Sequence, residues 1–133
     1  MNVKKDKKVR HFTDLVVWNK AHNLFVDIFK KTGDLPRQIG VNTIVDQILR
    51  SCGSISANIA EGFNTRTTKH YIHYLDTALN SASETENWLY KIKDCNLLAN
   101  DIVIPWLDVC SEIEKMLQKM IQNLSEKLTT TSH

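Results

Sequence analysis

Histidine and aspartate side chains at helical spacing are the first residues in this sequence that suggest chemistry. His70 and His73 are three positions apart and Asp76 follows after three more, so all three lie near one face of a helix. Zinc accepts imidazole and carboxylate ligands at such spacings. However, no fourth ligand is evident, and Tyr71 and Tyr74 give the segment a mixed surface. We therefore predict neither a metal site nor a cofactor.

Two other pairs of residues are weighed as catalytic groups. Ser51 and Cys52 are adjacent, but the sequence positions no histidine to act as their base. Glu84 and Glu86 are two positions apart, so they point to different helix faces and make a poor carboxylate pair. There is also no glycine-rich phosphate loop. The sequence therefore predicts a protein that is not an enzyme.

The stretch 54–63, SISANIAEGF, mixes apolar residues with small and polar ones. At 100° per residue, the isoleucines of a helix over residues 43–61 fall in one arc, which we expect to face the core. The opposite arc is mostly small, which lets another backbone approach closely. We predict that this arc packs against another chain, whose groups satisfy Asn58 and Glu61. The predicted subunit interface comprises Arg50, Gly53, Ser54, Ala57, Asn58, Glu61 and Glu84.

Charged residues in this interface need partners. Glu61 lies in the last turn of its helix, where the helix dipole disfavours a negative charge by up to about 1 kcal/mol. A cation from Arg66, Lys69, Arg50 or a neighbouring chain would offset this cost; a simply solvated Glu61 is the alternative. Glu84 is expected to pair with Arg50 across two helices.

Four amphipathic segments position these residues. Helices are predicted over residues 14–32, 43–61, 67–96 and from 101–105 to 127, because apolar residues recur at helical spacing in each. Short connections between long helices predict an all-α, antiparallel up-down-up-down four-helix bundle that forms a homo-oligomer. The predicted organisation is a basic flexible tail (1–11), the bundle (12–128) and a frayed tail (129–133).

Individual residues mark the expected ends and faces of these helices. Thr13 is predicted to cap the first helix, and Gly33 and Gly62 are predicted to stop the first and second. Pro105 is expected in the first turn of the fourth helix. The apolar stripe predicted for the first helix consists of Leu15, Trp18, Phe25, Ile28 and Phe29.

The composition is that of an ordinary globular chain. It has 133 residues, of which 42% are apolar and 24% charged, with four glycines and two prolines. No apolar run approaches the ~20 residues that span a bilayer, and the basic N-terminus lacks the apolar core of a signal peptide. The three cysteines are far apart, which favours reduced core thiols and a cytoplasmic location.

Charge is unevenly distributed along the chain. Residues 1–11 carry +4, residues 20–69 carry +3 and residues 70–133 carry −4. This polarity suits self-association through opposite surfaces or a local basic patch, whereas strong nucleic-acid binding usually needs a concentrated basic footprint. The candidate nucleic-acid contacts are Lys4, Lys5, Lys7, Lys8 and Arg10 in the tail, with Lys30, Lys31, Arg37, Arg66 and Lys69 at helix ends. The alternative is that these are solvated charges.

Three sequence elements carry a resemblance to a known family. Phe12, Leu15 and Trp18 match a Phe-x-x-Leu-x-x-Trp pattern, and residues 50–62 match an Arg followed by Ser-Ile-x-x-Asn-Ile-Ala-Glu-Gly. Residues 81–86 match a Ser-x-x-Glu-x-Glu element. On these residues the chain resembles the 23S rRNA intervening-sequence protein family over about residues 12–125. It departs from the family pattern at Ser56, where proline is usual.

The resemblance implies a fold and a set of partners. The family is similar in fold to the accessory protein of diversity-generating retroelements, which forms homopentamers and binds nucleic acid and a reverse transcriptase. It therefore implies a bacterial pentamer of four-helix bundles, with RNA, DNA, a reverse transcriptase or another protein as possible partners, and no enzyme activity. The alternative function is a protein–protein adaptor with no nucleic-acid role.

Overall fold

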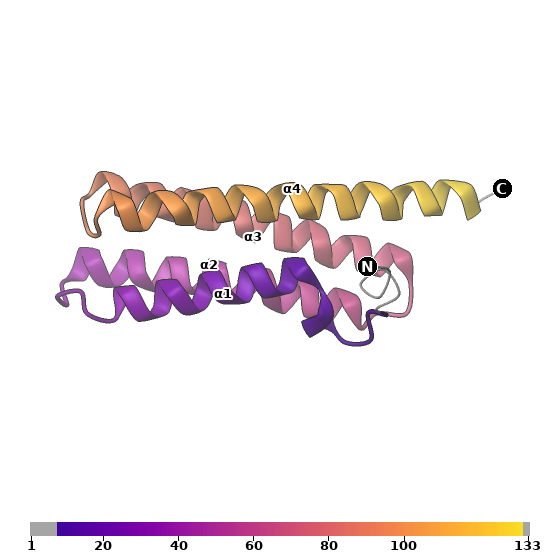
Figure 1. Ribbon diagram of the computed structural model, residues 1–133, viewed down its shortest axis with the longest axis horizontal. Coiled ribbons are helices and arrows are strands. Elements are labelled where there is room, and N and C mark those ends of the chain that lie inside the picture. The colour runs from indigo at the N-terminus through magenta and orange to yellow at the C-terminus, as the bar shows by residue number, and fades with distance from the viewer. Residues whose placement is uncertain (1–7, 132–133) are drawn as a thin grey trace, which may run out of the picture.

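The computed structural model describes residues 8–131, and in its last two residues only the backbone. This part of the chain contains four α-helices and one turn of 3-10 helix, and no β-strand (Figure 1). The prediction of an all-α chain is therefore confirmed. None of the described helices is long and apolar enough to cross a membrane. The elements are η2 (Phe12–Asp14), α1 (Val16–Thr32), α2 (Ile39–Phe63), α3 (Thr68–Asp94) and α4 (Asn100–Thr131).

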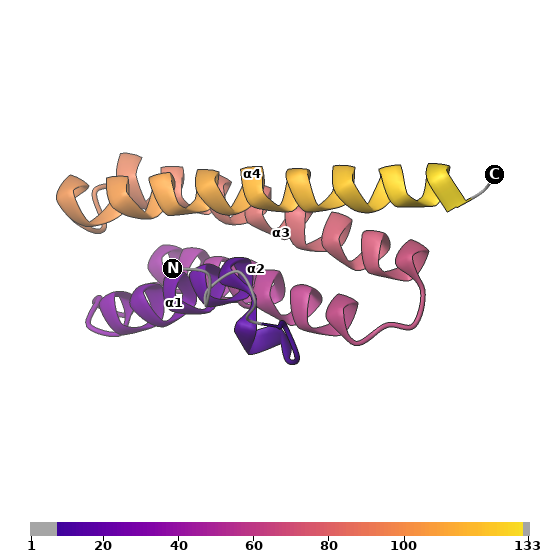
Figure 2. The same ribbon diagram turned by 45° about the vertical axis from the view of Figure 1, so that its right-hand side comes forward.

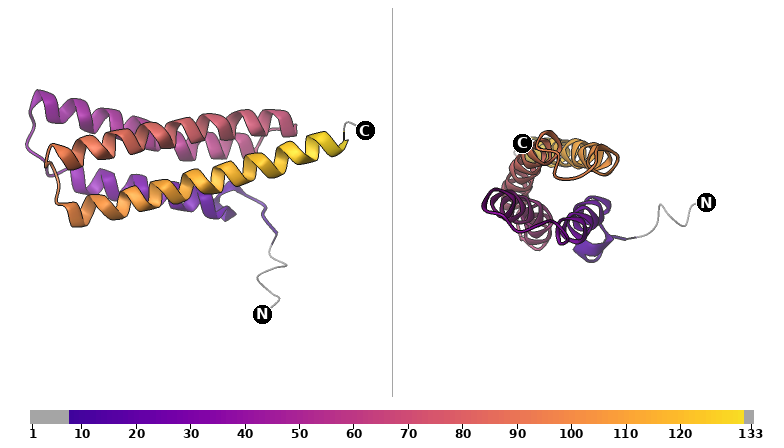
Figure 3. Two further views of the ribbon diagram at one scale, coloured as in Figure 1. Left: turned by 90° about the horizontal axis from the view of Figure 1, so that it is seen from above. Right: turned by 90° about the vertical axis from the view of Figure 1, so that its left-hand side faces the viewer.

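Neighbours in sequence are also neighbours in space. α2 packs against α1 and α3, α3 packs against α4, and α4 returns to contact α1, as the end-on view in Figure 3 shows. The α1–α2 and α3–α4 connections lie at one end of the molecule and the α2–α3 connection at the other (Figure 1). Since α1 has 17 residues and α4 has 32, α4 extends well past the start of α1 (Figure 2).

The core is formed by one apolar stripe from each helix. On α1 the buried apolar residues are Val17, Ala21, Leu24 and Ile28, spaced three or four apart as a helix face requires. Each of the other helices supplies a further stripe, and on α2 it contains the isoleucines that were expected to face the core. The fully buried apolar residues of these three helices are Ile48, Cys52, Ile55, Ile59, Leu75, Ala78, Ala82, Leu89, Ile92, Val103, Cys110, Ile113 and Leu117.

The stripe predicted for α1 is only partly correct. Ile28 is buried, but Trp18 and Phe25 are half-buried and Phe29 is 58% exposed. These aromatic residues lie beside the core face, because smaller Val17 and Ala21 occupy the positions closest to the other helices. The first helix therefore presents a buried core face and, beside it, aromatic residues that the described residues cover only in part.

The first helix begins differently from the prediction. Thr13 does not cap α1 but lies within η2, where its backbone N–H donates to Nδ1 of His11 at 3.3 Å. The Asp14 carboxylate accepts the backbone N–H of His11 at 3.1 Å, so these groups form a reciprocal capping box. α1 then starts at Val16 without a side-chain cap.

Only one of the two glycines that were predicted to stop helices does so. α1 ends at Gly33 as predicted, although Gly33 keeps right-handed backbone angles (φ −63°) rather than a left-handed conformation. Gly62 lies inside α2, which continues to Phe63. A positive φ occurs instead at Asn96 (φ 57°), where α3 ends. There the N–H of Leu97 donates to the Ile92 carbonyl at 3.0 Å, as in a Schellman motif.

The fourth helix is longer than predicted at both ends. It begins at Asn100, so Pro105 lies past the first turn, and its missing N–H leaves one intrahelical bond unmade. At the other end the helix continues to Thr131, beyond the predicted end near residue 127.

Candidate functional site

A line of hydrogen-bonded hydroxyl groups joins α2 to α3. The hydroxyl of Ser54 accepts a hydrogen bond from Ser81 on α3 at 2.9 Å and another from the Asn58 amide at 2.9 Å. One turn away, the Thr85 hydroxyl donates to Ser51 at 3.0 Å. We call these five residues the α2–α3 seam. Ser51 and Thr85 are 2% and 0% exposed, and their hydroxyl groups are satisfied by each other and by the backbone carbonyls of Ile48 and Ser81 rather than by water.

Within the seam, the Asn58 amide nitrogen has a different partner from the neighbouring chain that was predicted for it. This nitrogen donates to the Ser54 carbonyl at 2.8 Å as well as to the Ser54 hydroxyl, so its donors are satisfied within the chain. A neighbouring subunit is therefore not needed to pair this half-buried amide nitrogen. That the surrounding arc also faces another copy stays a prediction.

The expected ion pair between Arg50 and Glu84 is present. The Arg50 Nη2 lies 3.2 Å from Oε2 of Glu84, which also accepts a 3.4 Å hydrogen bond from the Trp88 indole. Arg50 further donates to Gln47 one turn earlier. Because the Arg50 side chain is 66% exposed, this pair contributes at most about 1 kcal/mol.

The other members of the predicted interface have separate surroundings. Gly53 faces α1, where a Cβ atom would lie 3.3 Å from the Phe25 ring. Ala57 and Glu61 are exposed, and no hydrogen bond or ion pair of the Glu61 side chain is found within the described residues. The small arc of α2 is thus shared between α1, α3 and solvent.

Gly62 is a contact point rather than a helix stop. A Cβ atom at this position would lie 2.9 Å from Cβ of Tyr74 and 3.0 Å from the ring of Tyr71. Real Cβ atoms do not approach a side-chain carbon on a neighbouring helix so closely. The absence of a side chain at Gly62 therefore permits α2 and the first turns of α3 to touch.

A pair of carboxyl groups on α3 and α4 was missed in the sequence. Burial first, and then the neighbouring Glu86 carboxyl, raise the pKa of Glu114 to about 7. Oε2 of Glu114 is buried and has no hydrogen-bond partner in the described residues. The sequence carried one signal: Glu114 lies four residues after Cys110 and three before Leu117, at core spacing.

The remaining candidate groups have structural surroundings. The His70 ring lies 2.6 Å from the Thr67 hydroxyl at the start of α3, and the His73 ring packs edge-on against Tyr74. Within residues 8–131 no three His, Cys, Asp or Glu side chains are grouped so as to hold a metal ion. Burial raises the pKa of the Cys52 thiol to about 12, which keeps it protonated and unreactive.

The basic residues are divided between the two ends of the molecule. Lys30, Lys31 and Arg37 lie at the α1–α2 end, whereas Arg66 and Lys69 lie at the α2–α3 connection, at the end where the described chain starts (Figure 1). Lys8 and Arg10 are exposed at that start, while Lys4, Lys5 and Lys7 lie outside the described residues.

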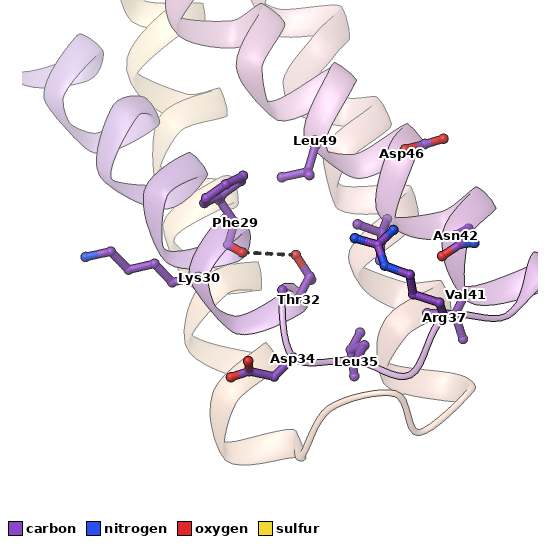
Figure 4. A pocket seen from close by; sticks show the side chains of 12 residues that line it. Phe29, Lys30, Thr32, Asp34, Leu35, Arg37, Val41, Asn42, Asp46 and Leu49 are labelled. Atoms are coloured by element: carbon purple, nitrogen blue, oxygen red, sulfur yellow. Dashed lines mark hydrogen bonds between the residues drawn. The ribbon is translucent and has the colours of Figure 1, made fainter.

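A groove lined by both apolar and charged residues opens between the end of α1 and the first half of α2. Its volume is about 410 Å³. Figure 4 shows Phe29 of α1 and Leu49 of α2 on opposite sides of the opening, with Arg37 beside Val41 and Asn42 near the start of α2. Ile39, at the start of α2, is 88% exposed beside it. The apolar residues that line this α1–α2 groove are Phe29, Leu35, Val41, Val45 and Leu49.

Comparison with known proteins identifies the family of this chain. The model of the 23S rRNA-intervening sequence protein family matches residues 13–119. The chain belongs to this family. A solved structure of a protein with unknown function, from the S23 ribosomal protein family of Bacteroides thetaiotaomicron VPI-5482, is similar to it with a TM-score of 0.72 and 28% identity. That similarity covers 80% of this chain and 98% of the other. No curated protein matches.

The resemblance inferred from the sequence motifs is thus confirmed. As a 23S rRNA-intervening sequence protein, the chain has its α2–α3 seam and all seven predicted interface residues within the matched segment. The basic residues at positions 4–10 lie outside it. Family membership therefore bears on the bundle and its surfaces, and not on the basic start of the chain.

The close contact at Gly62 predicts a position-specific cost of adding one methyl group. Gly62→Ala should destabilise the fold by about 1–3 kcal/mol, because Tyr71 and Tyr74 must move. Gly40→Ala is the matched control in the same helix, since nothing lies within 4 Å of its added Cβ; it should stabilise by about 0.5–1 kcal/mol. Urea unfolding of both variants measures this. Equal stabilities would contradict the assigned contact.

The carboxyl pair predicts a pH dependence of a defined sign. The folded-state pKa of Glu114 is raised, so its protonated form stabilises the fold, and this stability is lost as pH rises from about 4.5 through about 7. Relative to wild type, Glu114→Gln should therefore be more stabilising at pH 8.5 than at pH 5.5. We expect a change of about 1 kcal/mol, discounted for partial exposure, or roughly 3–4 °C in Tm. Exposed Glu61→Gln is the control, and parallel curves for the two variants would refute the interpretation.

Proposed function

We propose that this 23S rRNA-intervening sequence protein is a non-enzymatic scaffold that assembles with copies of itself. In this proposal each chain is an antiparallel up-down-up-down bundle, and the copies form a homopentamer. The alternating ends at which the helices connect support the bundle topology. The pentamer rests on the family resemblance.

The observation that carries self-assembly is the apolar surface around the α1–α2 groove. Phe29 is 58% exposed and Ile39 is 88% exposed, although burying such a side chain contributes about 1.5–3 kcal/mol. Large exposed apolar groups beside a groove are typical of surfaces that another protein covers.

Charge favours a second copy as the covering molecule. Residues 20–69, which contain most of α1 and all of α2, carry a net charge of +3, whereas residues 70–133, with most of α3 and all of α4, carry −4. The α1–α2 half of one copy therefore attracts the α3–α4 half of the next. A contact between two different faces repeats from copy to copy, and it closes into a ring when the rotation permits.

The proposal includes a cytoplasmic location. Cys52, Cys95 and Cys110 are all free thiols, and this suits a reducing compartment. No catalytic step is assigned, since the buried thiols are protonated and the histidines serve local contacts.

Nucleic-acid binding is the second part of the proposal. Lys8, Arg10, Arg66 and Lys69 are exposed at the same end of the molecule. In a ring, each copy would add the same charges to one rim, so weak contacts would combine into a stronger one. The alternative, an adaptor that binds only proteins, would leave these charges solvated and RNA or DNA unbound.

Replacing the exposed apolar residues by charges tests the assembly. The double variant Phe29→Glu/Ile39→Glu should be monomeric by light scattering where wild type is a pentamer, because carboxylates in a covered apolar surface are costly. Val16→Glu, which changes a 60% exposed residue at the other end of α1, is the matched control and should keep the wild-type mass. A monomeric wild type, or an unchanged mass in the double variant, would refute assembly through this surface.

A further inference from the structure

Four aromatic rings form a continuous array where the chain enters α1. The His11 and Phe12 ring centroids are 4.1 Å apart, and Phe12 lies 5.3 Å from Trp18. Trp18 in turn stacks on His22 at 4.7 Å with an interplanar angle of 9°. The array joins residues of η2 to residues of α1, so it depends on how the two elements are held together.

Hydrogen bonds fix that arrangement. The Asn19 amide donates to the Thr13 carbonyl at 2.7 Å and to the Leu15 carbonyl at 2.9 Å, which ties the first turn of α1 back to η2. His11 is held by the Thr13 hydroxyl, which lies 2.9 Å from its Nδ1. The rings are therefore preorganised, so a ligand that stacks on them loses little binding free energy to ordering these side chains.

Packing against the core explains the position of only two of the four rings in the array. Phe12 and Trp18 are half-buried, and Trp18 packs against the core. His11 and His22 are exposed at the two ends of the array. An exposed imidazole adds little to core burial. Because both histidines are exposed, part of the aromatic surface of the array is open to solvent.

Positive charge lies beside this aromatic surface. Lys8 and Arg10 are exposed and directly precede the array. The Asp14 carboxylate accepts the backbone N–H groups of Arg10 and His11, at 3.0 and 3.1 Å. Lys20 is paired with Glu112 at 2.9 Å, so we assign it no role. Stacked aromatic rings next to basic side chains are the combination that binds unpaired bases together with their phosphates.

We propose that His11, Phe12, Trp18 and His22 form a stacking platform for the bases of a single-stranded nucleic acid. Lys8 and Arg10 bind the adjoining phosphates. The proposal rests on the nucleic-acid part of the proposed function and gives it a site and a preference for unpaired strands. Sequence contributes little to recognition, because every base has a face that can stack.

Binding of a short adenine oligomer tests the platform. The probes are single-stranded RNA and DNA of one length carrying 2-aminopurine, whose emission is quenched when it stacks, and an abasic strand of equal charge. Wild type should bind both base-containing strands and quench them. His11→Ala/His22→Ala should lose about tenfold in affinity and most of the quenching. His73→Ala, which removes an exposed histidine from α3, should change affinity by less than about twofold.

The remaining variants distinguish the contribution of stacking from that of charge. They also distinguish failure of the platform from failure of the proposed function. Lys8→Ala/Arg10→Ala should weaken binding of the abasic and base-containing strands alike and flatten the salt dependence. Wild-type binding that His11→Ala/His22→Ala leaves unchanged would overturn the platform while nucleic-acid binding stands. Absence of any wild-type binding at low salt would overturn both. Tighter binding of RNA than of DNA would assign a contact to the 2′-hydroxyl, whereas equal binding would support stacking and phosphate contacts alone.

Discussion

The close approach of α2 and α3 is the constraint on which the rest of the molecule depends. Two helices can come this near only where side chains are small, and the seam supplies serine and threonine at successive turns while Gly62 removes the last obstacle. Hydroxyl groups in such a contact must bond to each other or to nearby backbone carbonyls, since water is excluded around Ser51 and Thr85. The contact therefore fixes the register of α3 against α2 and also determines which polar groups remain for other partners.

Because one side of α2 packs against α3, the other side of α2 determines which surfaces stay exposed between α2 and α1. Gly53 receives Phe25 of α1, and further along the same side the two helices diverge into the α1–α2 groove. The opposite end of α1 carries the aromatic array and the basic start of the chain. In our account, one end of the α1–α2 pair serves assembly and the other serves nucleic-acid binding, so the two activities do not compete for one surface.

Periodicity predicted most of the fold but not the roles of individual residues. Apolar spacing identified four helices and the core face of α2, because burial repeats with every turn. It failed on α1, where Trp18 and Phe29 are apolar yet lie beside the core. The pairing of Arg50 with Glu84 followed from charge, whereas the partner of Asn58 did not, since a single sequence does not show whether a small polar face meets its own chain or another. Gly62 was taken for a helix stop because its contact with Tyr74 depends on α3, twelve residues further along.

A double-mutant cycle between Ser54 and Ser81 tests the central claim that the seam is satisfied within one chain. Ser54→Ala, Ser81→Ala and the double variant would be unfolded in urea at protein concentrations above and below the point where chains associate. Our account predicts a coupling of about 0.5–1.5 kcal/mol that is the same at both concentrations. Additive effects, or coupling that is present only when chains are associated, would contradict it.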